Sequence, residues 1–523
     1  MAETEVLRME HISKVYPNGV MANKDIQLSI RKGEIHALSG ENGAGKTTLM
    51  KILFGEESPT NGSIYINGEK VHITSPTVAI RYGIGMVHQH FMLVPSLNVV
   101  ENMILGIEPT RGILIDKKKA EEKVKEISEK YNFQIPLNKP VRELSVGQKQ
   151  KVEILKVLFH GATILILDEP TAVLTPQETT ELFVQLKKLK ASGHTIVFIS
   201  HKLHEVKELC DRITIIRSGK TMGVYNIDEI SEEDISNIMV GRDVSLTIPK
   251  EKKQAKGVAA SVRNLTVVNA NGDVCINDLS LKTRYGEIFG IAGIEGNGQQ
   301  EFADALVGGM TYQQGSISLA GHDIRGLNQD RIRELKVSHI PADRMTMGIS
   351  PNLPISLNIC ADKLGKRSAS LGLCSPAGVV NVKKITEYSK DKIKKYTILC
   401  KSEEVPVNSL SGGNMQKVVL ARELSAEPDL IIANQPTRGV DVGASEMIRR
   451  ELIAMRDRDK AVILISSDLT ELLNLSDRLV VFLDGKIAAY FPDTENLTEE
   501  QLGVYMLGLE KQTAEQIGEA AND

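Results

Sequence analysis

The stretch "GENGAGKTT" (residues 40–48) has the residue types and spacing of a phosphate-binding loop. It fits G-x-x-x-x-G-K-[ST] and lies between an apolar strand-like run and a helix-like run. In such a loop, backbone N–H groups turn toward a phosphate and the following helix adds its positive N-terminus. We expect Lys46 to reach the outer phosphates and Thr47 to bind Mg²⁺. The residues predicted to line the loop are Gly40, Glu41, Asn42, Gly43, Ala44, Gly45, Lys46, Thr47 and Thr48.

An acidic pair follows the apolar run "ILIL" at residues 168 and 169. Asp168 is placed to hold the Mg²⁺ shell, and Glu169 is placed to polarise an attacking water as a general base. The alternative is that the pair ends a strand and caps the next helix.

Three further side chains are functional candidates because of their order along the chain relative to these motifs. His201 follows the strand-like run "TIVFIS", where it could contact a γ-phosphate. Gln89, in "GMVHQHF", is a candidate sensor of the γ-phosphate and Mg²⁺, and Tyr16 could stack on a base. Each alone would be read as an ordinary structural or surface residue.

Short β-branched runs must position these side chains. "TILIL", "TIVFIS", "LIIA" and "AVILIS" read as buried parallel strands. They alternate with helix-length segments, which predicts an α/β fold.

The sequence contains two copies of a domain-sized repeat. "KGEIHALSGENGAGKTT" from Lys32 matches "YGEIFGIAGIEGNGQQE" from Tyr285 at an offset of 253, and later blocks match at an offset of 266. The second copy therefore carries 13 extra residues, which we expect to include the loop-like stretch 365–378. We predict cassette-sized domains at 1–247 and 258–510, an exposed lysine-rich linker at 248–257, and a polar tail that could fray at 511–523.

Composition excludes several classes of protein. The chain has 523 residues with 25% charged and 41% hydrophobic residues, as in ordinary globular proteins. A net charge of -4 gives no sign of nucleic-acid binding, and no apolar run reaches the roughly 18 residues of a membrane span. The five cysteines have no metal-ligand spacing and suit a reducing cytoplasm.

The order of these motifs resembles that of ATP-binding-cassette (ABC) ATPases. The phosphate loop, the glutamine loop, "LSVGQ", "ILILDEP" and "FISHKL" all occur in that family's order, and the resemblance covers the whole chain once per copy. It implies two tandem P-loop NTPase domains, each with a RecA-like core, an antiparallel β subdomain and a helical signature subdomain. ATP and Mg²⁺ are the implied cofactors.

The second copy has lost most of the charged groups of this chemistry. Asn269 stands opposite Tyr16, and the other replacements at the corresponding positions are Gln299, Gln300, Ala342, Asn434, Gln435 and Ser467. A site without the lysine, both carboxylates and the histidine has lost most of its electrostatic stabilisation.

The same copy keeps a different set of residues. Its signature "LSGGN" supplies Ser411, Gly412, Gly413 and Asn414, and its D-loop "RGVD" retains Asp441. In the first copy the signature has Val146 and the D-loop position has Thr175. Cassette ATPases are known to close head to tail, so the resemblance implies that ATP on Lys46 is completed by the second copy's signature.

The resemblance is strongest to the twin-cassette ATPase subunits of bacterial simple-sugar and nucleoside importers, which share "IMVGRD" (238–243) and "LSGGN". "VHQHFMLVPSL" with "IIANQPTRGVDVGA" favours the branch served by basic-membrane-protein lipoproteins, which imports purine nucleosides. Two permease subunits and an extracellular solute-binding lipoprotein are the implied partners. The implied location is the cytoplasmic face of the bacterial cell membrane, with membrane contact through the permeases only and no nucleic acid.

Two alternatives remain. A ribose, galactose or autoinducer-type sugar importer would use the same machinery, although such ATPases usually keep Asp-Glu in the second acidic pair. Twin-cassette translation factors usually keep two intact sites and a long basic linker, which this chain lacks.

Overall fold

The strand-like runs of the sequence lie at the centre of two separate units. The computed structural model divides the chain into Met1–Val244 and Ser245–Asp523, and each unit is described by itself. This division lies three residues before the predicted boundary at residue 247. The described residues are 5–17, 19–89, 91–112, 114–171, 174, 176–200, 202–242, 248–269, 271–364, 373 and 379–522.

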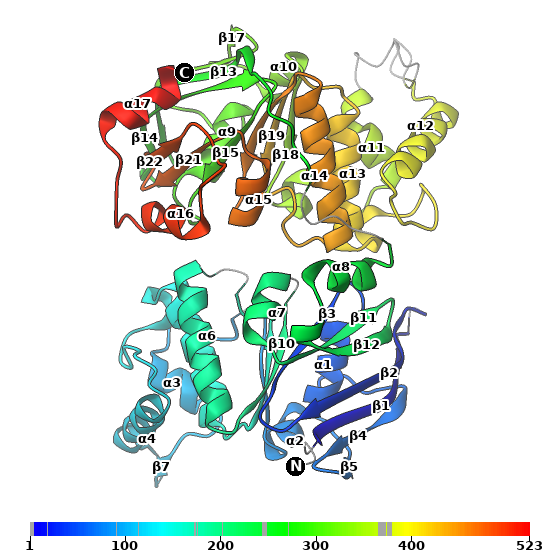
Figure 1. The fold of residues 1–523 in the computed structure, drawn as a ribbon, viewed down its shortest axis with the longest axis vertical. Coiled ribbons are helices and arrows are strands. Elements are labelled where there is room, and N and C mark those ends of the chain that lie inside the picture. The colour runs from blue at the N-terminus through cyan, green and yellow to red at the C-terminus, as the bar shows by residue number, and fades with distance from the viewer. Residues whose placement is uncertain are drawn as a thin grey trace. The chain divides into compact units, whose positions relative to one another are not determined.

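A six-stranded sheet forms the core of the first unit (Figure 1). Its order is β12-β11-β3-β10-β9-β6, with β12 antiparallel and the others parallel. Strands β3, β9 and β10 are buried at every position, as their continuous apolar sequences predict. The strands are β3 (Ile35–Gly40), β6 (Ile84–Val87), β9 (Ile164–Asp168), β10 (Thr195–Ile199), β11 (Arg212–Arg217) and β12 (Lys220–Asn226).

Helices connect these strands, and two smaller parts complete the first unit. An antiparallel sheet has the order β2-β1-β4-β5, and a helical part carries the signature helix α5. The sheet comprises β1 (Glu5–Val15), β2 (Met21–Arg31), β4 (Asn61–Ile66) and β5 (Glu69–Val71), with a small hairpin of β7 (Thr110–Arg111) and β8 (Leu114–Ile115) elsewhere. The helices are α1 (Lys46–Phe54), α2 (Pro76–Arg81), α3 (Val99–Ile104), α4 (Lys117–Lys130), α5 (Val146–Phe159), α6 (Pro176–Ala191), α7 (Leu203–Leu209) and α8 (Glu232–Val240).

The second unit repeats this architecture. Its sheets have the orders β18-β19-β20-β15-β21-β22 and β14-β13-β16-β17, so the duplicated α/β fold is confirmed. The strands are β13 (Lys256–Val268), β14 (Val274–Tyr285), β15 (Ile288–Ala292), β16 (Gln314–Leu319), β17 (His322–Asp323), β18 (Val337–Ile340), β19 (Leu430–Asn434), β20 (Ala461–Ile465), β21 (Arg478–Leu483) and β22 (Lys486–Phe491). The helices are α9 (Gln299–Leu306), α10 (Gln329–Glu334), α11 (Ile355–Cys360), α12 (Val382–Lys395), α13 (Gly412–Leu424), α14 (Val442–Asp457), α15 (Leu469–Leu475), α16 (Glu499–Met506) and α17 (Ala514–Asn522).

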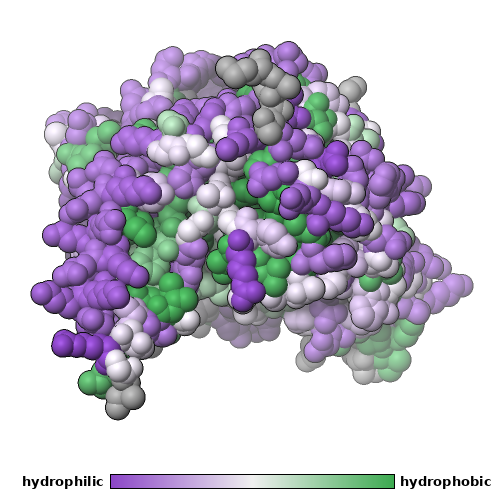
Figure 2. All heavy atoms as spheres, turned by 90° about the horizontal axis from the view of Figure 1, so that it is seen from below, coloured by the Kyte–Doolittle hydropathy of each residue, from purple (hydrophilic) through white to green (hydrophobic). Residues whose placement is uncertain are grey.

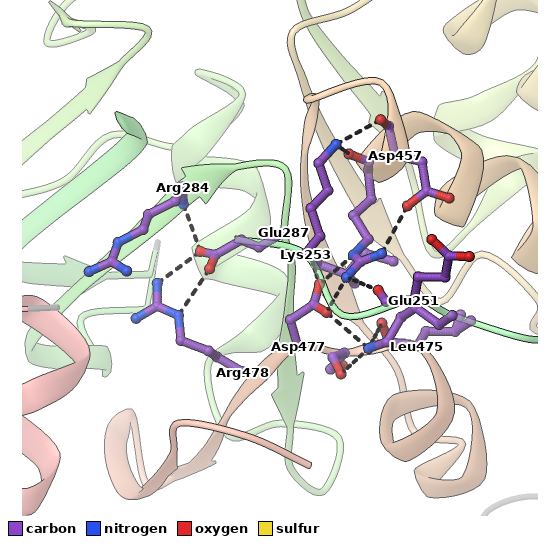
Figure 3. Close-up of polar contacts among 12 residues, drawn as sticks. Glu251, Lys253, Arg284, Glu287, Asp457, Leu475, Asp477 and Arg478 are labelled. Atoms are coloured by element: carbon purple, nitrogen blue, oxygen red, sulfur yellow. Dashed lines mark hydrogen bonds and ion pairs between the residues drawn. The ribbon is translucent and has the colours of Figure 1, made fainter. Parts of the chain in front are cut away.

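The lysine-rich segment 248–257 is anchored to the second unit, although its composition predicts a linker. Lys250 Nζ donates to the carbonyl oxygens of Leu475 (3.0 Å) and Ser476 (2.6 Å). Lys253 Nζ donates to the Asp457 carbonyl at 2.7 Å (Figure 3). Side chains of this segment remain partly exposed, but β13 already begins at Lys256. Residues from 248 onward therefore belong to the second unit.

A buried arginine provides the other half of this anchor. Arg456 is 1% exposed and donates to both carboxylate oxygens of Asp477, at 2.9 and 3.0 Å. Its Nη2 also donates to the Glu251 carbonyl at 2.8 Å (Figure 3). A bidentate ion pair of this kind fixes the relative orientation of the two side chains as well as neutralising their charges.

The prediction of a frayed tail is wrong for residues 514–522. They form α17, which contacts β14 and β22. Ala520 is fully buried, Ile517 packs against the core, and the Gln512 side chain bonds the Tyr490 backbone at N and O. The tail is polar only on its outer side.

Part of the predicted insertion can be located. Strands β6 and β18 begin at positions 253 apart, whereas Asn102 and Asn358, which make matching sets of three hydrogen bonds to backbone carbonyls, are 256 apart. Three extra residues therefore lie in the turn after β18. The loop-like stretch 365–378 falls outside the described residues, apart from Leu373.

Hydrophobic side chains on the face drawn in Figure 2 lie in small, separate groups among polar ones. Within the described part of the chain, we find no helix with the length and apolar character required to cross a membrane.

Candidate functional site

The loop 40–45 has the backbone that a phosphate-binding loop requires. It joins β3 to α1, and Gly43 (φ +82°) and Gly45 (φ +101°) adopt left-handed conformations that favour glycine. A Cβ at Gly40 would lie 2.2 Å from the Ile216 carbonyl oxygen, so only glycine allows this approach to β11. Helix α1 has no side-chain N-cap, which leaves its first N–H groups for an anion.

Lys46 lies folded against its own loop. Its side chain is buried, and Nζ donates to the carbonyl oxygens of Gly40 (2.6 Å) and Glu41 (3.0 Å). The ammonium group is therefore held beside the N-terminus of α1. A phosphate bound there would contact both the Lys46 ammonium and the positive end of the helix dipole.

The predicted Mg²⁺ ligands Thr47 and Asp168 are brought together. Thr47 Oγ1 lies 3.5 Å from Asp168 Oδ2 at the end of β9. Burial raises the pKa of Asp168, and the charge of Glu169 raises it further. The hydroxyl from the first turn of α1 and the carboxylate at the end of β9 are oxygen donors of the kind that Mg²⁺ prefers, so the residues fit this ion.

Glu169 and Gln89 are hydrogen-bonded to each other across the sheet edge. Gln89 Nε2 donates to Glu169 Oε2 at 2.8 Å. Glu169 has φ +48°, an uncommon conformation for this residue type and one often found at functional sites. His201 and Thr175 lie outside the described residues.

Tyr16 is half-buried beside the phosphate loop. Its hydroxyl lies 3.5 Å from Thr48 Oγ1, and the Lys14 ammonium lies 5.2 Å from the ring centroid. Stacking of adenine on Tyr16 stays a prediction.

In the second unit, the corresponding groups are engaged with one another. Gln299 Nε2 donates to the Ile294 carbonyl at 3.2 Å, where Lys46 makes the equivalent contact with Glu41. Asn434 Nδ2 donates to Gln300 Oε1 at 2.9 Å, and Gln300 Nε2 donates to both oxygens of Asp304 at 3.0 Å. The neutral amides of Asn434 and Gln300 thus form a hydrogen-bond chain that ends on Asp304, in the place of the Mg²⁺ ligands.

Gln435, at the position that corresponds to Glu169, is also hydrogen-bonded within its own unit. Gln435 keeps the left-handed backbone of Glu169, with φ +50°. Its Oε1 accepts hydrogen bonds from Ser467 N (3.1 Å) and Ser467 Oγ (3.0 Å). Ala342 lies just after β18, and its methyl side chain offers no hydrogen-bonding group in the place of the Gln89 amide.

The signature residues begin the same helix in both units. Ser145 is the N-cap of α5, and Ser411 is the N-cap of α13. Asn414 Nδ2 donates to Ser411 Oγ at 2.9 Å, and Asn414 Oδ1 accepts from the Leu399 N–H. Asp441 caps α14 through a 2.7 Å bond from the Ala444 N–H.

One residue near this signature is not predicted from the sequence motifs. Arg344, in the turn after β18, donates to the backbone of the D-loop. The change of the repeat offset from 253 to 256 at this turn is the signal that could have drawn attention to it.

Comparisons with known proteins agree with this geometry. The family described as "ABC transporter" matches residues 23–172 and again 276–438. The nucleoside import ATP-binding protein NupA of Lactococcus lactis is 43% identical over 97% of this chain and 99% of its own length. The guanosine import ATP-binding protein NupO of Bacillus subtilis is 44% identical, covering 96% and 97%. The glucose import ATP-binding protein TsgD13 of Haloferax volcanii is 38% identical, covering 97% and 96%.

Proposed function

The chain belongs to the ABC transporter family, and we propose that it is the ATP-hydrolysing subunit of a bacterial importer of nucleosides, with purine nucleosides favoured. The observation that carries the ATPase assignment is the grouping of Lys46, Thr47, Asp168 and Glu169 around one phosphate loop. The similarity to NupA and NupO over nearly the full chain supports the nucleoside class. A sugar importer is the second candidate, because TsgD13 is also similar over nearly its full length.

Five side chains in and around the first phosphate loop have chemical roles in this proposal. Lys46 leaves the carbonyls of Gly40 and Glu41 to contact the β- and γ-phosphates. Thr47 and Asp168 would hold Mg²⁺, which when bound would neutralise charge on the phosphates. Glu169 accepts a proton from the attacking water, and Gln89, now bonded to Glu169, orients this carboxylate.

We propose further that ATP on Lys46 is completed by Ser411, Gly412, Gly413, Asn414 and Asp441 of a second-copy signature and D-loop. The support is the pattern of losses along the sequence. The second copy has lost its own phosphate-binding and hydrolytic side chains but keeps the signature glycines and Asp441. The first copy keeps the converse set and has Val146 in its signature.

The partners of such a subunit are two membrane-spanning permeases and an extracellular solute-binding lipoprotein. The chain would then lie at the cytoplasmic face of the membrane and contact it through the permeases.

The transported substrate can be identified in an assay of the complete transporter. We expect a purine nucleoside such as guanosine or inosine, added with the binding protein to proteoliposomes, to stimulate ATP hydrolysis severalfold, because substrate-loaded binding protein favours the hydrolytic state. Ribose, galactose and glucose serve as matched additions in the same assay. Stimulation by a sugar and not by any nucleoside would contradict the nucleoside assignment and support the second candidate.

Restoring a lysine to the second phosphate loop should change little. Gln299 already occupies the place of Lys46, so Gln299→Lys can keep the bond to the Ile294 carbonyl. Asn434, Gln435 and Ser467 would still lack the charges that hydrolysis needs, so we expect turnover within about twofold of the unaltered chain. Steady-state ATP hydrolysis measures this. The double variant Glu169→Gln/Gln299→Lys should remain inactive, and recovered turnover would contradict the assignment of a single hydrolytic site.

A further inference from the structure

The turn after β18 takes the place of a glutamine loop but has a different structure. Residues Arg344–Gly348 form a single π-helical turn, a rare conformation often found at functional sites. Asp343 begins the turn by accepting hydrogen bonds from the Met345 N–H (2.8 Å) and the Thr346 hydroxyl (2.7 Å). In the first copy the corresponding segment 88–93, "HQHFML", is three residues shorter and has no arginine.

Arg344 extends from this turn to the D-loop of its own unit. Its Nη1 donates to the Arg438 carbonyl at 2.8 Å, and its Nη2 donates to the Gly439 carbonyl at 3.4 Å. Gly439 has φ +64°, so its carbonyl is presented by a backbone that favours glycine. Hydrogen bonds from a charged donor are stronger than neutral ones, so the D-loop backbone is held at two successive residues.

The same guanidinium group packs against the signature. A Cβ at Gly412 would lie 2.8 Å from Arg344 Nη2, and a Cβ at Gly413 would lie 2.8 Å from Asp441 Oδ2. Both signature glycines therefore allow close approach, one to Arg344 and the other to the D-loop aspartate. The signature, the D-loop and the turn after β18 therefore pack directly against one another.

The partial burial of Arg344 has an energetic cost. Its Nε is buried and has no hydrogen-bond partner among the described residues. A buried donor without a partner is unfavourable, so the hydrogen bonds of the two Nη atoms to the D-loop are what hold the guanidinium group here. On the same turn, Met345 and Met347 are 41% and 49% exposed, which leaves its outer side open to a partner.

We propose that Arg344 is a positioning residue for ATP hydrolysis: it holds the second copy's signature and D-loop in the arrangement that stabilises ATP bound at Lys46. The inference rests on the composite site proposed above. The turn after β18, which takes the place of a glutamine loop, would thus act on ATP through Arg344 and the backbone of residues 438 and 439.

The test uses the complete transporter in proteoliposomes. Arg344→Ala should lower kcat for ATP about tenfold with little change in KM, because ATP is bound mainly through the Lys46 loop and the signature acts in the transition state. Arg344→Lys should recover part of this loss, since lysine keeps the charge but not the planar fork. The matched control is Arg331→Ala, which removes an exposed arginine paired with Glu334 from the same unit and should leave both constants unchanged.

Several outcomes would overturn the inference. They are an unchanged kcat in Arg344→Ala, an equal loss in Arg331→Ala, or a raised KM with normal kcat. If Arg344→Ala does not fold, Arg344→Lys and Arg344→Gln carry the same test, with thermal unfolding as the check on folding.

If the composite-site proposal itself is wrong, the variants give a different pattern of activities. In that case Ser411→Arg hydrolyses ATP normally, whereas failure of the present inference alone leaves Ser411→Arg inactive and Arg344→Ala active.

Discussion

Glu169→Gln is expected to leave ATP binding nearly intact and to lower its hydrolysis by roughly 10²- to 10⁴-fold, the range of general-base catalysis. The change removes the base but leaves Lys46, Thr47 and Asp168 to hold the phosphates and Mg²⁺. The substitution should not strain the backbone, because Gln435 already occupies the same left-handed conformation in the second unit. Single-turnover hydrolysis and equilibrium binding of ATP measure the two effects separately.

The matched control is Gln435→Glu at the corresponding position of the second unit. Its carboxylate can still accept the hydrogen bonds from Ser467 N and Oγ, so folding should be preserved. Without a lysine at position 299 or an acid at position 434, we expect no gain or loss of turnover. Near-normal hydrolysis in Glu169→Gln would show that another group accepts the proton from water.

Most of the fold could be predicted from the sequence because the repeat is long and its strands are buried. The runs ending at Asp168 and Ile199 form fully buried parallel strands, as their β-branched composition predicts. The loop at Lys46 and the contact between Thr47 and Asp168 also follow from motif spacing.

Other features depend on tertiary contacts that composition does not record. The segment 248–257 is lysine-rich, yet Lys250 and Lys253 bind backbone carbonyls at helix ends, where the helix dipole favours cations. The tail 511–523 is polar overall, but Ile517 and Ala520 pack one side of α17 against the core, and Gln512 bonds to the Tyr490 backbone. A short amphipathic helix takes its stability from such packing, so its sequence alone gives a weak signal.

The role of Arg344 could not be inferred from a motif because its partners are backbone atoms. The carbonyls of Arg438 and Gly439 carry no sequence information about a donor 94 residues away. The rearranged network of Gln300, Asn434 and Asp304 is similar, since Asp304 has no counterpart among the motifs. Where the first copy has Thr47 and Asp168, the second copy has neutral amides that hydrogen-bond to each other and to Asp304.

Ser411→Arg is the second change for which we expect a large effect, a loss of hydrolysis of about 100-fold or more. Ser411 belongs to the copy that lacks its own hydrolytic residues, so its importance would arise only through ATP held by the other copy. In the proposed composite site, an arginine at this position would place a bulky cation where the γ-phosphate is expected and would remove a hydroxyl donor. Steady-state hydrolysis by the purified transporter measures the loss.

The decisive comparison is with Ser145→Arg, the same change in the first copy's signature. Ser145 and Ser411 are both helix N-caps, so each variant loses a cap of about 1 kcal/mol and should be destabilised to a similar degree. The composite site predicts that Ser145→Arg retains most of its activity, because the ATP site it would complete has Gln299, Asn434 and Gln435. Equal activity in the two variants would contradict that asymmetry, whereas selective loss in Ser411→Arg would mean that the second copy is retained for the signature it presents to ATP.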